Sequence, residues 1–293
     1  MMREIKGQTA LGTHGGSMNF DMGTTWSRAM ELVKDNFQLL AVISGIFLLL
    51  PTLATYLFIP DIQTLLDPTA DPEVMAAQMQ ESLGPILGVG LIAMIFQFAG
   101  YGAMVALMGP NRPTVGEAIK TGLKIVLSTF GIFLIFMIAY FIIALVIMIP
   151  ITMLAGAAGA PGLAVIAVAL ILVMIIVLLA RMSMSMPVMV LENTLNPIKA
   201  VSRSLKLTGP KQWQIVLFWG ILGAAYLVIA LLITGVFGVV AALAGSSFVG
   251  TLILGLANGV MGMIVAMVVC GLAVAMYDQL AGPDGADITS TFD

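Results

Sequence analysis

Six unbroken apolar blocks, each 20 to 30 residues long, dominate this sequence and leave very few folds open to it. A helix needs about 20 such residues to cross the roughly 30 Å of hydrocarbon in a bilayer. The charged share of the chain is 9%, whereas soluble domains average about 25%. The alternation typical of a transmembrane barrel is missing. We therefore predict an all-α integral membrane protein with about six transmembrane helices, at 37–58, 84–108, 125–154, 163–190, 214–243 and 248–277.

These blocks divide the chain into three parts. Residues 1–36 form an N-terminal tail with an interfacial segment, 37–277 form the six-span domain, and 278–293 form a short acidic tail. The first block is longer than the roughly 7–15 apolar residues of a secretory signal. We expect it to remain as the first membrane span, and we expect the acidic tail to be disordered.

The basic residues predict the orientation of the chain. All twelve fall on alternate hydrophilic segments, whereas 59–83, 155–162 and 244–247 contain none. Under the positive-inside rule, this distribution places the N-terminus in the cytoplasm, and an even number of spans returns the C-terminus there. The twelve residues are Arg3, Lys6, Arg28, Lys34, Arg112, Lys120, Lys124, Arg181, Lys199, Arg203, Lys206 and Lys211.

A short amphipathic basic segment precedes each odd-numbered span. Two of these segments have helix-start chemistry: Thr114 and Glu117 form a capping box, and Asn196 is an N-cap followed by Pro197. We expect three units, each an interfacial helix followed by a helical hairpin. The alternative is that basic, capped loops occur in any multi-pass protein. The three segments are 25–34, 114–124 and 196–206.

The third segment shows the amphipathic pattern most clearly. Apolar and basic side chains take opposite faces at helical spacing, which is typical of a helix lying in the headgroup layer. The apolar face carries Ile198, Val201 and Leu205, and the basic face carries Lys199, Arg203 and Lys206.

Inside the six spans there is no Asp, Glu, Lys or His. Ionisable groups within a membrane usually mark ion pathways, proton relays or substrate sites, so their absence disfavours a coupled transporter or an intramembrane hydrolase. Gln97 and Asn258 are the notable polar groups inside the spans. We interpret them as interhelical hydrogen-bond partners, with a substrate contact as the alternative. Because Cys270 is the only cysteine and His14 the only histidine, we expect no metal and no cofactor.

Two further patterns predict local structure. Gly84 with Gly88, and Gly255 with Gly259, have the spacing of close helix packing. The sequence Asp71-Pro72-Glu73 predicts the start of a short helix that runs to about residue 82.

Arg181 follows eighteen apolar residues, Leu163–Ala180. At 1.5 Å per residue these cover about 27 Å, which places Arg181 at the inner edge of the hydrocarbon. A guanidinium at that depth needs a partner, and we expect either Glu192 or a lipid phosphate. The stretch that follows is expected to bend at Pro187 and remain helical.

From Arg181 onward, a run of 33 residues has a distinctive pattern, which consists of Arg181, Pro187, Val188, Leu191, Glu192, Pro197, Ser202, Arg203, Ser204, Leu207, Thr208 and Trp213. With these residues the run resembles the membrane domain that is fused to some bacterial glycerophosphodiester phosphodiesterases and that also occurs alone. The resemblance implies a multi-pass bacterial membrane domain without assigned catalytic or ligand residues. It does not imply the phosphodiesterase reaction, which belongs to a separate soluble barrel.

We therefore expect a non-catalytic protein of the bacterial inner membrane that interacts with lipid, or anchors partners, through its basic cytoplasmic face. Each Lys or Arg near an anionic surface contributes about 1 kcal/mol. The expected partners are anionic lipid headgroups, another membrane protein or a second copy, and no nucleic acid. The alternatives are a passive channel or facilitator for a small or amphipathic molecule, a membrane enzyme, and basic residues that only set topology. The candidate headgroup ligands are Arg181, Lys199, Arg203 and Lys206.

The predicted orientation can be tested by cysteine labelling in a Cys270→Ala background. A cysteine at position 70 should react with an impermeant maleimide from the outer face of the cytoplasmic membrane. A cysteine at position 205 should react only after that membrane is broken. The reverse pattern would contradict the orientation derived from the basic residues.

Overall fold

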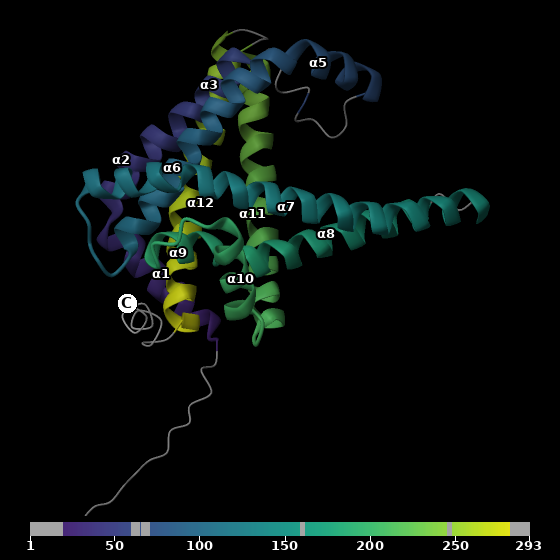
Figure 1. Cartoon of the computed structure of the whole chain (residues 1–293). Coiled ribbons are helices and arrows are strands. Elements are labelled where there is room, and N and C mark those ends of the chain that lie inside the picture. The colour runs from purple at the N-terminus through teal and green to yellow at the C-terminus, as the bar shows by residue number, and fades with distance from the viewer. Residues whose placement is uncertain (1–19, 60–64, 66–70, 159–161, 245–247, 282–293) are drawn as a thin grey trace, which may run out of the picture.

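The computed structural model of the chain describes residues 20–59, 65, 71–158, 162–244 and 248–281, and these form helices and connecting turns without a strand (Figure 1). Six helices or helix runs in this part are long and apolar enough to cross a membrane. The predicted all-α multi-pass fold is confirmed. The elements are α1 (Met22–Asp35), α2 (Phe37–Ser44), η1 (Gly45–Leu49), α3 (Leu50–Phe58), α5 (Pro72–Pro85), η2 (Ile86–Gly90), α6 (Leu91–Met108), α7 (Val115–Ala158), α8 (Leu163–Met182), α9 (Ser185–Leu191), α10 (Pro197–Thr208), α11 (Gln212–Leu243) and α12 (Phe248–Ala281).

The two ends of the described chain meet at one end of the molecule. Helix α1 packs along the last turns of α12, with α9 and α10 beside them (Figure 1). The Asp21 backbone N–H donates to Gln279 Oε1 at 3.3 Å, and Gln279 Nε2 donates to the Asp21 carbonyl at 3.4 Å. We call this the basic end, because α1 and α10 carry Arg or Lys, whereas α5 at the opposite end carries acids and no base. The charge asymmetry of the sequence is therefore also an asymmetry in space.

The predicted helix starts are confirmed. Asn196 Oδ1 accepts from the Ile198 and Lys199 backbone N–H groups at 3.0 and 3.1 Å. Thr114 and Glu117 form the reciprocal capping box: the Thr114 N–H donates to Glu117 Oε2 at 2.8 Å, and the Glu117 N–H to Thr114 Oγ1 at 3.4 Å. In the same way, Asp71 accepts from the N–H two residues on, at 2.8 Å. A further cap, Asp21 Oδ1, accepts from a backbone N–H, which lowers the pKa of that carboxyl.

Three expected boundaries differ in the structure. Residues 115–124 are not a separate interfacial helix but the first turns of α7, because no proline interrupts them and Gly122 packs tightly on α6. The helix that starts at Pro72 continues through η2 into α6, so it does not end near residue 82. Helix α12 extends to Ala281, beyond the expected start of the acidic tail. Position 70, His14 and most of that tail lie outside the described residues.

Two π-helical turns interrupt spans one and two, and each adjoins a proline. Pro51 follows η1 and Pro85 precedes η2. A proline removes one backbone donor, so the hydrogen bonds near it shift register. At η1, the Leu50 N–H accordingly donates to the Gly45 carbonyl, five residues back. Both turns lie where α3 and α6 run side by side.

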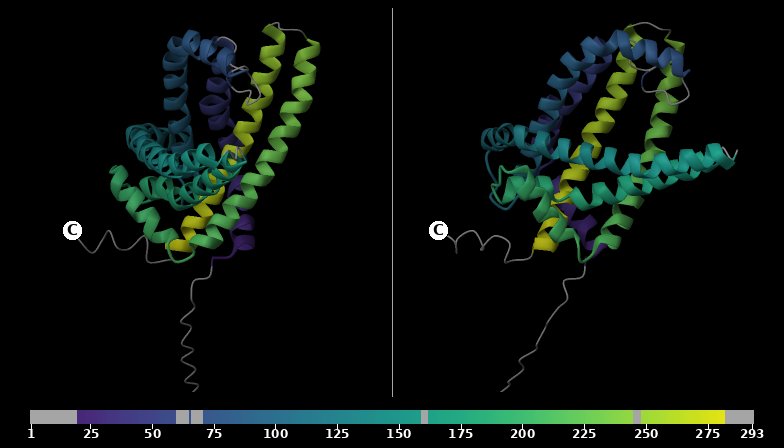
Figure 2. Two further views of the ribbon diagram at one scale, coloured as in Figure 1. Left: turned by 90° about the vertical axis from the view of Figure 1, so that its right-hand side faces the viewer. Right: turned by 45° about the vertical axis from the view of Figure 1, so that its right-hand side comes forward.

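The core is built around α12. Its second half is buried almost continuously, and α1, α3, α6 and α11 pack against it (Figure 2). Small residues allow these close approaches: a Cβ added at Gly259 would lie 2.5 Å from Leu49 Cδ1, and one at Gly255 would lie 3.0 Å from Tyr56 Cβ. The predicted packing at this glycine pair is confirmed. At Gly84 and Gly88 the prediction is wrong, because an added Cβ would meet nothing within 4 Å.

Helices α7 and α8 form a hairpin that leaves the bundle at a steep angle and extends beyond it (Figures 1 and 2). At its base α7 contacts α6, α9 and α10, and along the rest of its length it packs on α8. Apolar side chains such as Leu127, Val146 and Val165 are exposed along it. Side chains of this kind, exposed along a whole hairpin, require hydrocarbon around them.

The tight contact between α6 and α7 gives a matched pair of substitutions. A Cβ at Gly122 would collide with the Ala99 carbonyl oxygen, whereas a Cβ at Gly116 in the same helix would meet nothing within 4 Å. Gly122→Ala should lower the free energy of unfolding by about 1–3 kcal/mol, as overpacking does. Gly116→Ala should not lower the free energy of unfolding, because alanine has a higher helix propensity than glycine. Thermal unfolding of both variants in the same detergent measures this, and equal stability would contradict the packing described.

Candidate functional site

The chain turns sharply at the basic end between α8 and α10. Helix α8 stops at Met182, and α9 starts at Ser185, before the proline that was expected to mark the bend. The reason is that Pro187 has no N–H to donate to the Ser183 carbonyl, so the helix breaks one turn earlier. A second turn follows α9 at Asn193, whose positive φ of 52° is one that asparagine tolerates.

Helix α10 closes the open end of α8. Ser204 Oγ donates to the Arg181 carbonyl at 2.7 Å. Thr208 Oγ1 lies 3.4 Å from the same oxygen and donates at 2.9 Å to the Ser204 carbonyl of its own helix. The last carbonyls of a helix lack partners within it, so the Ser204 hydroxyl satisfies one of them. Ser128 of α7 holds the connection before α10 by donating to the Leu195 carbonyl. The basic helix is thus fixed to the ends of two spans.

Contact with α8 and α9 defines the buried face of α10. That face consists of Ala200, Val201, Ser204 and Thr208. Of the expected apolar face, Val201 is buried within the protein, whereas Ile198 and Leu205 are exposed. Their contact with the headgroup layer stays a prediction. Lys199 and Lys206 are exposed, in agreement with the predicted basic face.

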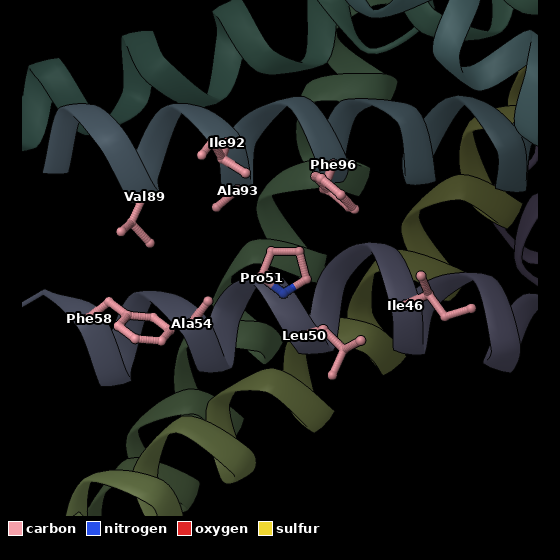
Figure 3. A pocket seen from close by; sticks show the side chains of 9 residues that line it. All are labelled: Ile46, Leu50, Pro51, Ala54, Phe58, Val89, Ile92, Ala93 and Phe96. Carbon is pink, nitrogen blue, oxygen red and sulfur yellow. The ribbon is translucent and has the colours of Figure 1, made fainter. Parts of the chain in front are cut away.

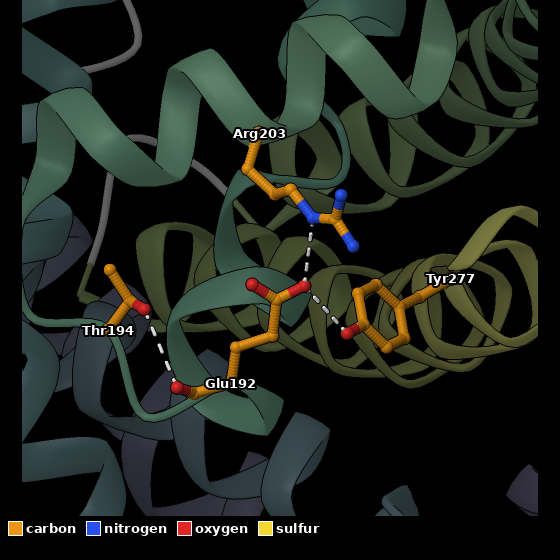
Figure 4. Close-up of polar contacts among 4 residues, drawn as sticks. All are labelled: Glu192, Thr194, Arg203 and Tyr277. Carbon is orange, nitrogen blue, oxygen red and sulfur yellow. Dashed lines mark hydrogen bonds and ion pairs between the residues drawn. The ribbon is translucent and has the colours of Figure 1, made fainter. Parts of the chain in front are cut away.

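Glu192 is the centre of a polar network at the basic end (Figure 4). Its Oε1 accepts from Arg203 Nε at 3.2 Å and from the Tyr277 hydroxyl at 2.8 Å. Its carbonyl accepts from Thr194 Oγ1 at 3.4 Å. The carboxylate therefore joins α9 and α10 to the end of α12.

Glu192 is consequently not the partner of Arg181. In the described part of the chain Arg181 forms no ion pair, and its Nη1 is buried without a hydrogen-bond partner. Its guanidinium lies at the C-terminus of α10, since a Cβ at Gly209 would be 3.4 Å from Arg181 Nη1 and 3.2 Å from the Leu205 carbonyl oxygen. The partial negative charge of a helix C-terminus attracts a cation, but it does not replace a full anionic partner.

A groove with entirely apolar walls lies between spans one and two (Figure 3). Its volume is about 370 Å³, and both π-helical turns contribute to its walls. Such a space can hold a hydrocarbon chain and offers nothing to an ion or a polar solute. The nine residues that line it are Ile46, Leu50, Pro51, Ala54, Phe58, Val89, Ile92, Ala93 and Phe96.

The two polar residues predicted inside the spans lie away from this groove. Asn258 Nδ2 donates to the Leu254 carbonyl of its own helix at 3.0 Å, so the predicted interhelical bond is not formed. Gln97 is partly buried and makes no hydrogen bond within the described residues. Cys270 is buried in α12. No group of three His, Cys, Asp or Glu that could hold a metal occurs in the described segments.

Together these features define a multi-pass α-helical membrane protein with a network of polar side chains around Glu192 at its basic end. No protein family, curated protein or solved structure matches the chain.

Sequence reasoning missed two parts of this site. Tyr277 could not be assigned to Glu192, because 85 residues separate them and a tyrosine at the end of an apolar span is common at membrane interfaces. Ser204 and Thr208 carry the family resemblance, but no contact with α8 was predicted for them, because the faces of the helix were defined by apolar and basic residues alone. The sequence does contain a pattern that indicates such a contact. The two small polar residues are four positions apart, on a helix that begins shortly after another helix ends.

The bond between Tyr277 and Glu192 can be tested by removing one hydroxyl. Hydrogen bonds to charged groups contribute about 1.5–3 kcal/mol, so Tyr277→Phe should lower the free energy of unfolding by roughly that amount. Tyr140 is the matched control, because its hydroxyl makes no hydrogen bond in the described structure. Tyr140→Phe should stay within about 0.5 kcal/mol of the parent. Chemical unfolding of the two variants checks this, and equal losses would rule out the network as a stabilising element.

Proposed function

We propose that this protein is a non-catalytic, multi-pass protein of the bacterial cytoplasmic membrane that binds phospholipid phosphate at its basic end. Both chain ends then lie in the cytoplasm, and the basic end faces the cytoplasmic leaflet. The observation that carries the proposal is the Arg181 guanidinium, which is partly buried at the end of a membrane span and has no carboxylate partner in the described structure.

A charge in this position is costly unless an anion compensates it. Glu192 is already engaged by Arg203 and Tyr277. The helix C-terminus beside Gly209 supplies only a partial charge. The Arg181 side chain is only partly buried, and a phosphate suits the N–H groups that stay accessible, because Arg binds phosphate through charge-assisted hydrogen bonds.

The surroundings of Arg181 support a lipid as the source of that phosphate. Arg181 lies in the last turn of the apolar helix α8, beside the C-terminus of the basic helix α10. Lys199 and Lys206 of α10 are exposed on the same end of the molecule. Each such cation near an anionic leaflet adds about 1 kcal/mol. Arg203 plays a different part from the one expected, because it is paired with Glu192.

Other features agree with a lipid-binding protein without catalysis. The apolar groove in Figure 3 can receive a hydrocarbon chain. The resemblance of residues 181–213 to the phosphodiesterase membrane domain carries no catalytic residues with it. The channel alternative receives no support from Asn258, whose amide is bonded to its own helix.

The proposal predicts how lipid retention depends on charge at the basic end. Arg181→Leu should reduce the phosphatidylglycerol and cardiolipin that stay bound in mild detergent by about fivefold, and Arg181→Lys should recover only part, because a lysine cannot form the bidentate fork. Adding Lys199→Gln and Lys206→Gln to Arg181→Leu should reduce retention further. Native mass spectrometry of the purified variants measures the bound lipid.

Lys120→Gln is the matched control, because it removes an exposed charge from another basic segment. It should leave retention unchanged. Glu192→Gln should lower the stability of the protein and leave lipid retention unchanged, since Glu192 stabilises the fold through Arg203 and Tyr277. Full retention in a folded Arg181→Leu protein, and in the triple variant, would leave these residues as topology signals only.

A further inference from the structure

A second cavity, of about 600 Å³, lies at the basic end and is distinct from the Arg181 site. It is formed where α1, the start of α2, the end of α6, the turn before α7 and the end of α12 meet. Its volume is within the range of about 300–1,000 Å³ that is typical of small-ligand sites. We call it the α1–α12 pocket. Its charged lining residues are Arg28, Asp35, Arg112 and Asp278.

The lining carries equal numbers of positive and negative charges. Arg28 is already engaged, because it forms an ion pair with Glu31 at 3.3 Å and lies close enough to Asp278 to interact with it. The side chains of Arg112 and Asp35 form no hydrogen bond or ion pair with any residue in the described ranges. One cation and one anion of the pocket therefore remain available to a ligand.

The backbone at Arg112 is a second, independent observation. Arg112 has a positive φ of 40°, which is uncommon for a residue with a side chain. It stands directly before Pro113, and proline further restricts the residue that precedes it. Conformations of this kind cost free energy and gather at binding sites, where the strain fixes a side chain in place. Here the turn that carries the strain brings Arg112 to the wall of the pocket.

The rest of the lining is mixed, because it includes the polar Asn36 beside apolar residues near the ends of spans one and two. Leu32 and Met108 are buried, so the accessible apolar surface comes mainly from Leu39 in the first turn of span one, which is 41% exposed. The pocket therefore suits a compact charged group with a small apolar contact beside it.

We propose that the α1–α12 pocket binds a phosphoethanolamine group, with the phosphate on Arg112 and the primary ammonium on Asp35. Arg112 supplies the fork that matches phosphate geometry, and the carboxylate of Asp35 accepts from an ammonium. The balanced lining selects a zwitterion, because a purely anionic head would leave the carboxylate of Asp35 unpaired beside it. The same group can reach the pocket as a phospholipid head or as a free soluble molecule.

The test uses the full chain carrying Arg181→Leu, so that the Arg181 site cannot contribute. Delipidated protein is offered equal amounts of phosphatidylethanolamine, phosphatidylcholine and phosphatidylglycerol, and native mass spectrometry measures what binds. Phosphatidylethanolamine should exceed both others by about fivefold, since a quaternary ammonium cannot donate a hydrogen bond to Asp35. Asp35→Asn should abolish the preference over phosphatidylcholine. Arg112→Gln should lower the binding of phosphatidylethanolamine itself about fivefold.

Both substituted side chains are exposed, so the variants should fold, and size-exclusion chromatography verifies this. Lys124→Gln, an exposed charge of α7 outside the pocket, should leave the preference unchanged. Displacement of the lipid by free O-phosphoethanolamine would support the site and assign it to a soluble ligand, whereas lipid binding that resists displacement would support it and assign it to the membrane. No preference in the parent, or an unchanged preference in both pocket variants, would overturn the proposal.

Discussion

The requirement that peptide groups find hydrogen bonds without water governs this structure. In hydrocarbon, each N–H and C=O must be satisfied within the helix or by another protein group. The spans meet this requirement along their length. Where a proline removes a backbone donor, the helix forms a π-helical turn or breaks near that proline. The requirement is hardest to meet at helix ends, where several carbonyls have no partner. Ser204 of α10 satisfies one of these carbonyls at the end of α8.

The packing of α10 on the end of α8 also determines which arginines at the basic end have a partner within the protein. By packing on the end of α8, helix α10 brings Arg203 to Glu192 and to the end of α12, and it places its own C-terminus beside Arg181. One arginine is then neutralised by a carboxylate within the protein, and the other is left for a ligand. The same short helix therefore stabilises the fold and creates the site that we assign to a phosphate.

Sequence could predict the parts of the fold that depend on local physics. The spans follow from block length, and the caps at Asn196, Thr114 and Asp71 follow from side-chain chemistry within three residues. The two glycine pairs show that residue spacing alone does not predict which segments of a helix pack closely. Both have the same spacing, but Gly259 meets Leu49 of span one, whereas Gly84 lies where no helix approaches. The difference depends on the neighbouring helix, which spacing does not encode.

The candidate site depends even more on contacts between distant segments. Arg181 was predicted from the sequence as a costly charge near a span end, and Glu192 as one of its two possible partners, but Glu192 is paired with Arg203 and Tyr277. Tyr277 lies 85 residues from Glu192, and Asp278 reaches the α1–α12 pocket from the far end of the chain. From its sequence neighbours alone, each of these residues is indistinguishable from an ordinary side chain at a membrane interface. Their roles appear only when α12 returns to the N-terminal helix.

The most direct measurement of the central claim is the distance between the Arg181 guanidinium and lipid phosphorus. Solid-state NMR can measure it through the dipolar coupling of ¹⁵N-labelled arginine side chains to ³¹P in a phosphatidylglycerol bilayer, with Arg181→Leu as the spectrum to subtract. The account predicts a dephased ¹⁵N signal that disappears in the variant, at a separation of about 4 Å, as a hydrogen-bonded guanidinium and phosphate require. A signal from Arg181 without coupling to ³¹P would contradict it.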